Sequence, residues 1–286
     1  MGLFNLLSPL LLAAGTTASP GCAPIPGWEH VVADEQIRWI VIGEVHGTNE
    51  IPAIFADAVC LTASSRRVVV GVEQLSADQS AIDAFMNSDG GAAAKAAFLS
   101  AGMWNQPAKD GRSSEASFRL FETLRQMRAK GLILSVIAFQ PSLLEGVSTQ
   151  AEAERVMANF NQADYEKSMA RLIEAAAQPD SVVLVLTGGF HAMLAEASWG
   201  PGFVGMAGHL PRQATLSFNA VPNGGESWTC QGQPIDCGPH PHMDEGRGHA
   251  HELKLQADNP LYSGTLYLGS RITVSPPQVG TARTAE

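Results

Sequence analysis

The chain has 286 residues, of which 45% are apolar and 16% are charged. This composition excludes disorder over the main body, and the length fits one large α/β domain. Because 28 acidic residues outnumber 18 basic ones and the formal charge is −10, the composition also argues against a nucleic-acid-binding surface.

The first 26 residues resemble a secretory signal, with a disordered amino-terminal segment as the alternative. A leucine-rich stretch at 3–14 is followed by small residues, as in the apolar region and cleavage zone of a signal peptide. No Lys or Arg precedes Arg38, however, so the positive start of a signal is missing. No later run is long and apolar enough to span a bilayer. We expect a periplasmic or secreted protein without a transmembrane segment in its mature form.

The four cysteines fit an oxidising compartment. Cys230 and Cys237 lie close together in a Gly/Pro-rich stretch that a disulfide can staple into a loop. Cys22 and Cys60 then remain to pair, although four cysteines allow three connectivities. Four free thiols in a reducing compartment are the alternative.

Short apolar runs alternate with helical patterns along the chain. Buried strands are predicted at 38–43, 68–72, 132–139 and 181–186. Helices are predicted from a cap at Thr48 to at least Val59, and at 78–87, 92–99, 114–130 and 151–177. This alternation predicts an α/β fold with a mostly parallel central sheet and helices on both faces.

After Gln213 the pattern changes. Strands are predicted at 214–221 and 264–275, separated by a polar, Gly/Pro/His-rich loop excursion at about 222–251. We expect these strands to add an antiparallel edge or a small hairpin beside the parallel sheet. The predicted domain is a single one over 27–275, followed by a frayed tail at 276–286.

Acidic residues and histidines follow three of the predicted strands. Glu44 and His46 follow the first, Glu73 follows the second and His191 follows the fourth. Ligands of parallel α/β sheets bind outside the carboxyl ends of the strands, so we expect these four side chains to share a pocket. Taken singly, each has an ordinary explanation as a helix-end charge or a structural histidine.

Three short motifs resemble those of one superfamily, which contains erythromycin esterases, haem-binding ChaN-like proteins and Tiki-type proteins. They are Gly-Glu-Val-His-Gly-Thr-Asn-Glu (43–50), Gly-Val-Glu (71–73) and Gly-Gly-Phe-His-Ala (188–192). The resemblance covers roughly 37–275 and is greatest to the bacterial ChaN-like members. The His-rich excursion and the loop between Cys230 and Cys237 are not part of the family pattern.

The resemblance implies that Glu44, His46, Glu73 and His191 are catalytic or ligand-binding residues. In a hydrolase, His46 would be the general base on a water, a neighbouring glutamate would fix its tautomer, and His191, at a helix start, would donate to the oxyanion. In a metal protein, the same four would hold a divalent ion. In a haem protein, one histidine would be an axial ligand. A serine nucleophile and nucleotide binding are disfavoured because neither a Gly-x-Ser-x-Gly elbow nor a glycine-rich phosphate loop is present.

The loop before the 114–130 helix supplies further candidates. Trp104, Asp110 and Arg112 resemble a substrate-loop signature of the ChaN-like branch. The prediction is a lid in which Arg112 grips an anionic group and Trp104 stacks on it, with Gln140 at the third strand end as another substrate contact. A solvated loop that ends in a helix cap at Ser113 or Ser114 is the alternative.

The leading functional hypothesis is an exported hydrolase that acts on an ester or related bond. The alternative is a non-enzymatic protein that binds haem or a divalent metal in the same pocket. Haem sites often use tyrosine, and because Tyr165, Tyr262 and Tyr267 lie away from the predicted strand ends, hydrolysis is favoured slightly. The expected partner is thus a small-molecule substrate or haem, and its identity depends on loop geometry.

Overall fold

The computed structural model describes residues 21–106, 109–232 and 235–278. Residues 1–20 of the expected signal or disordered segment lie outside this range. Among the described residues, no helix combines the length and the apolar character needed to cross a membrane.

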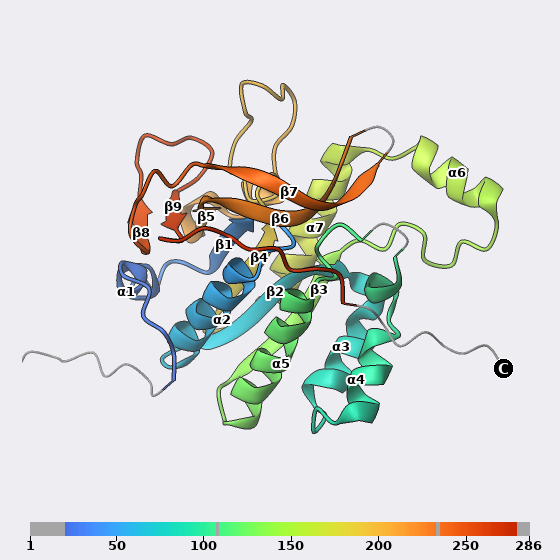
Figure 1. Ribbon diagram of the computed structural model, residues 1–286, viewed down its shortest axis with the longest axis horizontal. Helices are drawn as coiled ribbons and strands as arrows, with labels where there is room; N and C mark the ends of the chain where they lie inside the picture. The colour runs from blue at the N-terminus through green and yellow to red at the C-terminus, as the bar shows by residue number, and fades with distance from the viewer. Residues whose placement is uncertain (1–20, 107–108, 233–234, 279–286) are drawn as a thin grey trace, which may run out of the picture.

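A seven-stranded sheet organises the chain (Figure 1), with the strand order β3-β2-β4-β1-β5-β9-β8. Every neighbouring pair is parallel except β8 and β9, which form an antiparallel edge. The predicted fold class is therefore confirmed, and the first four predicted strands are present with small shifts at their ends. The strands are β1 (Trp39–Glu44), β2 (Arg67–Leu75), β3 (Leu134–Gln140), β4 (Ser181–Gly188), β5 (Thr215–Val221), β8 (Glu252–Leu255) and β9 (Gly264–Tyr267).

Helices cover both faces of this sheet. Successive side chains of a strand point to opposite faces, so Ile40 and Ile42 of β1 pack on one side and Val41 on the other. The first side meets α2 (Glu50–Ala63) and α5 (Glu115–Ala129), and the second meets α7 (Gln162–Ala176). Helices thus shield both faces of β1 from solvent, which explains its continuous apolar sequence.

Two helix predictions are wrong in detail. The helix expected at 151–177 is divided into α6 (Gln150–Ala158) and α7, because Asn161 ends the turn between them and accepts a hydrogen bond from the Asp164 amide at 3.0 Å. Thr48 does not cap α2, since it is buried and bridges to Val274. The remaining helices are α1 (Trp28–Val32), α3 (Gln79–Met86), α4 (Ala92–Leu99) and the 3₁₀ turns η1 (Ser76–Asp78), η2 (Gly102–Asn105), η3 (Met206–His209) and η4 (Arg212–Ala214).

The predicted excursion contains a two-stranded antiparallel sheet of its own, made of β6 (Asn223–Gln231) and β7 (Asp236–Asp244) and drawn in orange in Figure 1. Cys230 and Cys237 face each other across this hairpin and form a disulfide. The second disulfide joins Cys22 to Cys60, so both predicted pairings are confirmed.

The strands on either side of the hairpin differ from the prediction. Residues 214–221 do not form an antiparallel edge, because β5 pairs in parallel with β1. The strand expected at 264–275 ends at Tyr267. Beyond it, residues 276–278, expected to fray, pair with the start of α5: the Pro276 carbonyl accepts from the Glu115 amide at 2.9 Å.

Candidate functional site

The carboxyl ends of β1, β2 and β4 bring the four predicted side chains together. His46 Nδ1 lies 3.0 Å from Glu44 Oε1, and His46 Nε2 lies 3.7 Å from Glu73 Oε2. His191 Nε2 lies 3.8 Å from the other oxygen of Glu73. These strands are parallel and in register, so their ends reach the same edge of the sheet and converge on one carboxylate.

Glu73 is the centre of this arrangement and is 8% exposed. It accepts hydrogen bonds from Thr187 Oγ1 at 2.7 Å and from the Gly188 amide at 2.8 Å. Burial raises the pKa of this carboxyl, but the charges of His46, His191 and Arg112 together with the Gly188 amide lower that pKa to about 2. Glu73 is therefore a fixed negative charge between two imidazoles.

His46 is held between Glu44 and Glu73. Burial lowers the pKa of the imidazole, but the Glu73 charge and the hydrogen bond with Glu44 outweigh burial and raise that pKa to about 9. Burial also raises the pKa of Glu44. At neutral pH the ring of His46 is consequently protonated on both nitrogens, and Nε2 becomes a base only as the pH approaches 9.

His191 has a carboxylate partner that sequence reasoning missed. Its Nδ1 lies 2.8 Å from both oxygens of Glu166, which is fully buried and also accepts from the Met206 amide at 2.8 Å. Burial lowers the pKa of His191, but Glu166 and Glu73 raise it overall. The prediction of a helix start at His191 is wrong, because residues 188–192 form hydrogen-bonded turns without a helix.

A local signal for Glu166 exists in the sequence. Its position in α7 places it on the buried side of the helix, in a stripe completed by apolar residues three, four and seven positions later: Met169, Ala170 and Ile173. A carboxylate in such a stripe needs a partner, because burying an unpaired charge is costly. The sequence could therefore have indicated a buried partner, but not which residue it is.

The predicted substrate-loop residues fall into two groups. Arg112 bonds to Asp110, donates to Gln140 Oε1 at 2.7 Å and pairs with Glu73 Oε1 at 3.3 Å. Arg112, Asp110 and Gln140 therefore lie at the site. The guanidinium of Arg112 donates to acceptors of the protein itself, and it holds Glu73 in place. The Asp110 hydrogen bond and the Glu73 charge outweigh burial and raise the pKa of Arg112, so its charge is permanent.

Trp104 does not join the site. It is 1% exposed and lies in an aromatic cluster beneath the loop. Its ring meets that of Phe98 edge-on, with centroids 5.3 Å apart, and it also contacts Phe118 and Phe121. The structure therefore places Trp104 in the core. The helix cap weighed for this loop is present at Ser114, whose hydroxyl accepts from the Ser117 amide.

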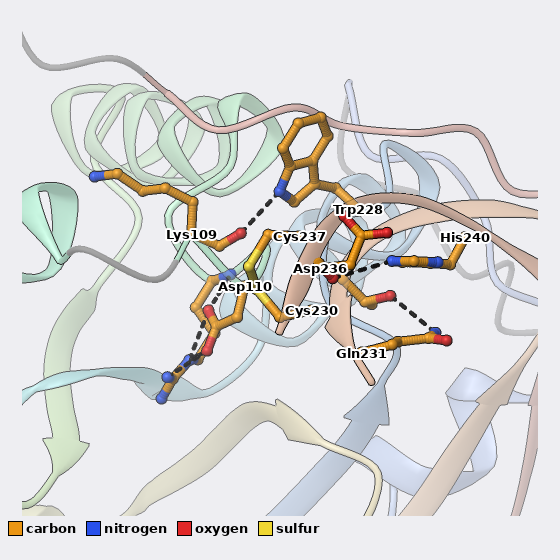
Figure 2. Close-up of a disulfide and its surroundings, with 10 residues drawn as sticks. Lys109, Asp110, Trp228, Cys230, Gln231, Asp236, Cys237 and His240 are labelled. Carbon is orange, nitrogen blue, oxygen red and sulfur yellow. Dashed lines mark hydrogen bonds and ion pairs between the residues drawn. A yellow bond between two sulfur atoms is a disulfide. The ribbon is translucent and has the colours of Figure 1, made fainter. Parts of the chain in front are cut away.

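A pocket of about 590 Å³ opens beside His46 and His191. The strand ends form one wall and the β6–β7 hairpin forms the other. Trp228 attaches the hairpin to the site: its indole donates to the Lys109 carbonyl at 2.8 Å (Figure 2), and its amide donates to the Gly47 carbonyl at 3.0 Å. The φ of Gly47 is 72°, and a Cβ there would collide with the Trp228 carbonyl, so only glycine allows this approach.

One tyrosine lies in this pocket although sequence reasoning set it aside. Tyr262 lines the wall and donates to the Gly189 carbonyl at 3.0 Å. His242 lines the opposite wall and contacts Ser227 Oγ at 2.9 Å. Both residues are distant from the predicted strand ends in sequence, so only the folded chain brings them to the site.

Within 21–106, 109–232 and 235–278, no three His, Cys, Asp or Glu side chains have the spacing of a metal-ligand group. His46 Nδ1 faces Glu44 and His191 Nδ1 faces Glu166, which leaves the Nε2 atoms of both imidazoles facing the Glu73 carboxylate.

No family model and no curated protein sequence matches this chain. Solved structures do match it. A mutant of erythromycin esterase EreC in its open conformation has a TM-score of 0.60 at 12% identity, over 88% of this chain and 95% of that one. A succinoglycan biosynthesis protein has a TM-score of 0.57 at 10% identity, over 87% and 91%. A Bacillus cereus protein has a TM-score of 0.51 at 10% identity, over 85% and 90%. At these identities the similarities show that the chain shares its fold with these proteins.

Proposed function

We propose that this protein is a hydrolase of an ester or related bond, with His46 as general base and His191 as oxyanion donor. The observation that carries the proposal is the geometry around Gly188. A Cβ at this position would lie 3.1 Å from His46 Nε2, 3.6 Å from His191 Cδ2 and 3.7 Å from Glu73 Oε2. Without a Cβ at this position, a reacting carbonyl can approach both imidazoles from the Gly188 side, next to Glu73.

His46 supplies the base in this proposal. Glu44 accepts a hydrogen bond from Nδ1–H, which leaves Nε2 to take a proton from a water once the ring is neutral. The water oxygen bonds to the acyl carbon, the ester C–O bond breaks, and the proton passes from His46 to the leaving alkoxide. The products are one carboxylic acid and one alcohol.

His191 supplies the electrophile. Glu166 accepts from its Nδ1–H, and the Glu166 hydrogen bond and the Glu73 charge outweigh burial and raise the pKa of His191, which favours the ring with both nitrogens protonated. Nε2–H can then donate to the oxyanion that develops on the carbonyl oxygen. Glu73 separates the two rings and stabilises the positive charge on each.

An extracellular or periplasmic location belongs to the same proposal. Both disulfides, Cys22–Cys60 and Cys230–Cys237, would be reduced in most cytosols and persist in oxidising compartments. Separating intact cells, periplasm and medium, followed by thiol labelling of the protein, tests this part.

The experiment is a kinetic one on a panel of activated esters. Wild-type protein should turn over at least one of them, with kcat/KM rising as the pH approaches about 9, because the base form of His46 appears there. His46→Gln should lose the activity. His30→Gln is the matched control, since that histidine is exposed on α1 and its side chain pairs with Glu29. Turnover that survives His46→Gln would remove His46 as the base.

A haem-binding protein is the second candidate, because the pocket contains residues that ligate haem elsewhere. His242 and Tyr262 line it, and both types serve as axial ligands. Haem titration of the purified protein tests this candidate through the Soret band. A stoichiometric band that is lost in His242→Gln or Tyr262→Phe, with no ester turned over, would overturn the hydrolase proposal.

A further inference from the structure

An exposed aromatic pair lies beside the proposed reaction centre. Phe190 is 63% exposed and Trp199 is 62% exposed, with ring centroids 5.4 Å apart and ring planes at 60°. Single exposed apolar residues are ordinary, but two large aromatic rings in contact with each other and with water indicate a binding surface. Because Phe190 immediately precedes His191, this surface begins next to the proposed oxyanion donor.

The apolar surface continues across the pocket to the hairpin. Met243 of β7 is 79% exposed and lines the same pocket as Phe190. Between them, Val45, Ala220 and Pro222 complete the apolar part of the lining. An apolar surface therefore runs from the reaction centre to the rim, and methionine adapts its shape to variable apolar partners.

The charges around the pocket disfavour substrates that carry an anionic group far from the reacting bond. Among the residues that line it there is no lysine or arginine, and the cations are the imidazoles at the reaction centre. Glu245 lies in the lining near the rim and would repel an anionic group there. A phosphate or carboxylate on the distal part of a substrate would thus find no lysine or arginine among these residues.

We infer that the substrate is an ester with an uncharged, long apolar acyl or alkyl chain that lies over Phe190, Trp199 and Met243. This inference rests on the proposed hydrolase function and specifies its substrate class. The occupant of the apolar surface is the substrate itself, because Phe190 and Met243 line the same pocket as Gly188, beside which the carbonyl is held, and Trp199 packs against Phe190. Each additional methylene that the surface buries should raise kcat/KM about fourfold.

The test compares p-nitrophenyl acetate with p-nitrophenyl decanoate below its critical micelle concentration. Wild-type kcat/KM should favour decanoate, and the double variant Phe190→Ser/Trp199→Ser should lose at least about tenfold more activity on decanoate than on acetate. The matched control is Ile133→Ser/Leu255→Ser, which removes apolar residues that are 60% and 58% exposed outside the pocket. This control should leave the ratio unchanged. Decyl acetate shows whether the acyl or the alkyl side carries the chain.

The outcomes separate the two proposals. Equal turnover of acetate and decanoate would overturn the chain inference and leave the hydrolase proposal intact. If no ester is turned over, the hydrolase proposal fails, and tryptophan emission titrated with 1-decanol and with ethanol tests the surface directly. A saturable change in emission with decanol but not with ethanol, lost in Trp199→Phe, would support a surface that binds apolar ligands. No change with decanol would overturn it.

Discussion

The two Glu–His pairs of the site reach the same geometry by different routes. Glu44 and His46 are two residues apart at the end of β1, whereas Glu166 and His191 are 25 residues apart, on α7 and on the turn after β4. In both pairs the carboxylate meets Nδ1, at 3.0 Å and at 2.8 Å. The first pair is thus determined by local backbone and the second by the packing of a helix against the sheet.

This difference has a chemical consequence. The Glu44 side chain is 10% exposed and that of Glu166 is 0% exposed, so the first carboxylate borders the pocket and the second is sealed behind His191. The first pair can exchange protons with a bound water, and the second serves as a fixed hydrogen-bond donor. The base and the oxyanion donor are assigned on this basis.

The largest expected effect tests this assignment directly. His46→Gln removes the general base and should lower kcat/KM on an activated ester by about 10³-fold, within the usual range for such a loss. His191→Gln removes one oxyanion donor and should cost about 10²-fold. Steady-state kinetics at pH 9 measures both. A larger loss for His191→Gln would reverse the two roles.

A smaller effect is expected at the glycine between the rings. Gly188→Ala introduces a Cβ 3.1 Å from His46 Nε2, whereas the nearest atom to a Cβ on Gly189 is Asn219 Oδ1 at 3.6 Å. Gly188→Ala should therefore displace His46 and lower kcat by about tenfold to a hundredfold. Gly189→Ala should lose much less, and thermal unfolding checks that both variants fold. Equal losses would show that the space beside Gly188 is not the reaction centre.

Glu44 and Glu166 should differ in how they affect the pH dependence of kcat/KM. Glu44→Gln removes a negative charge next to His46, so the pKa of His46 should fall from about 9 and the rising limb of kcat/KM should move about one unit lower. Glu166→Gln should lower kcat/KM about tenfold and leave that limb in place. If the rising limb of kcat/KM moved equally in both variants, the two Glu–His pairs would titrate as one unit.

The smallest effect concerns stability. The pKa of His46 is raised from 6.5 to about 9, so the stabilisation from its charge is complete below pH 6.5 and is lost as the pH rises through 9. The charged groups around the ring include Glu44, Glu73, Arg112, Asp110 and His191. We expect the free energy of unfolding to fall by about 2 kcal/mol over this interval. Urea denaturation at both pH values measures it, and His46→Gln should show a smaller fall.

Most of the fold followed from local patterns. The buried strands β1, β2, β3 and β4 were predictable because a strand covered on both faces must be apolar throughout. The break between α6 and α7 was missed because the polar and apolar residues keep a helical spacing on both sides of it. Asn161, the cap of α7, does not stand out among the polar residues around it. The parallel pairing of β5 was missed because pairing direction depends on the path of the chain, which no single strand encodes.

The sequence by itself determined which residues stand at the strand ends, and Glu44, His46, Glu73 and His191 converge because parallel strands in register end at one edge. The tertiary structure decided what surrounds them. It placed Trp104 in the core, where an aromatic cluster buries more of the ring than a position on the loop surface would. It also placed the Glu166 carboxylate on His191, because a charge on the buried side of α7 is stable only beside a hydrogen-bonding partner.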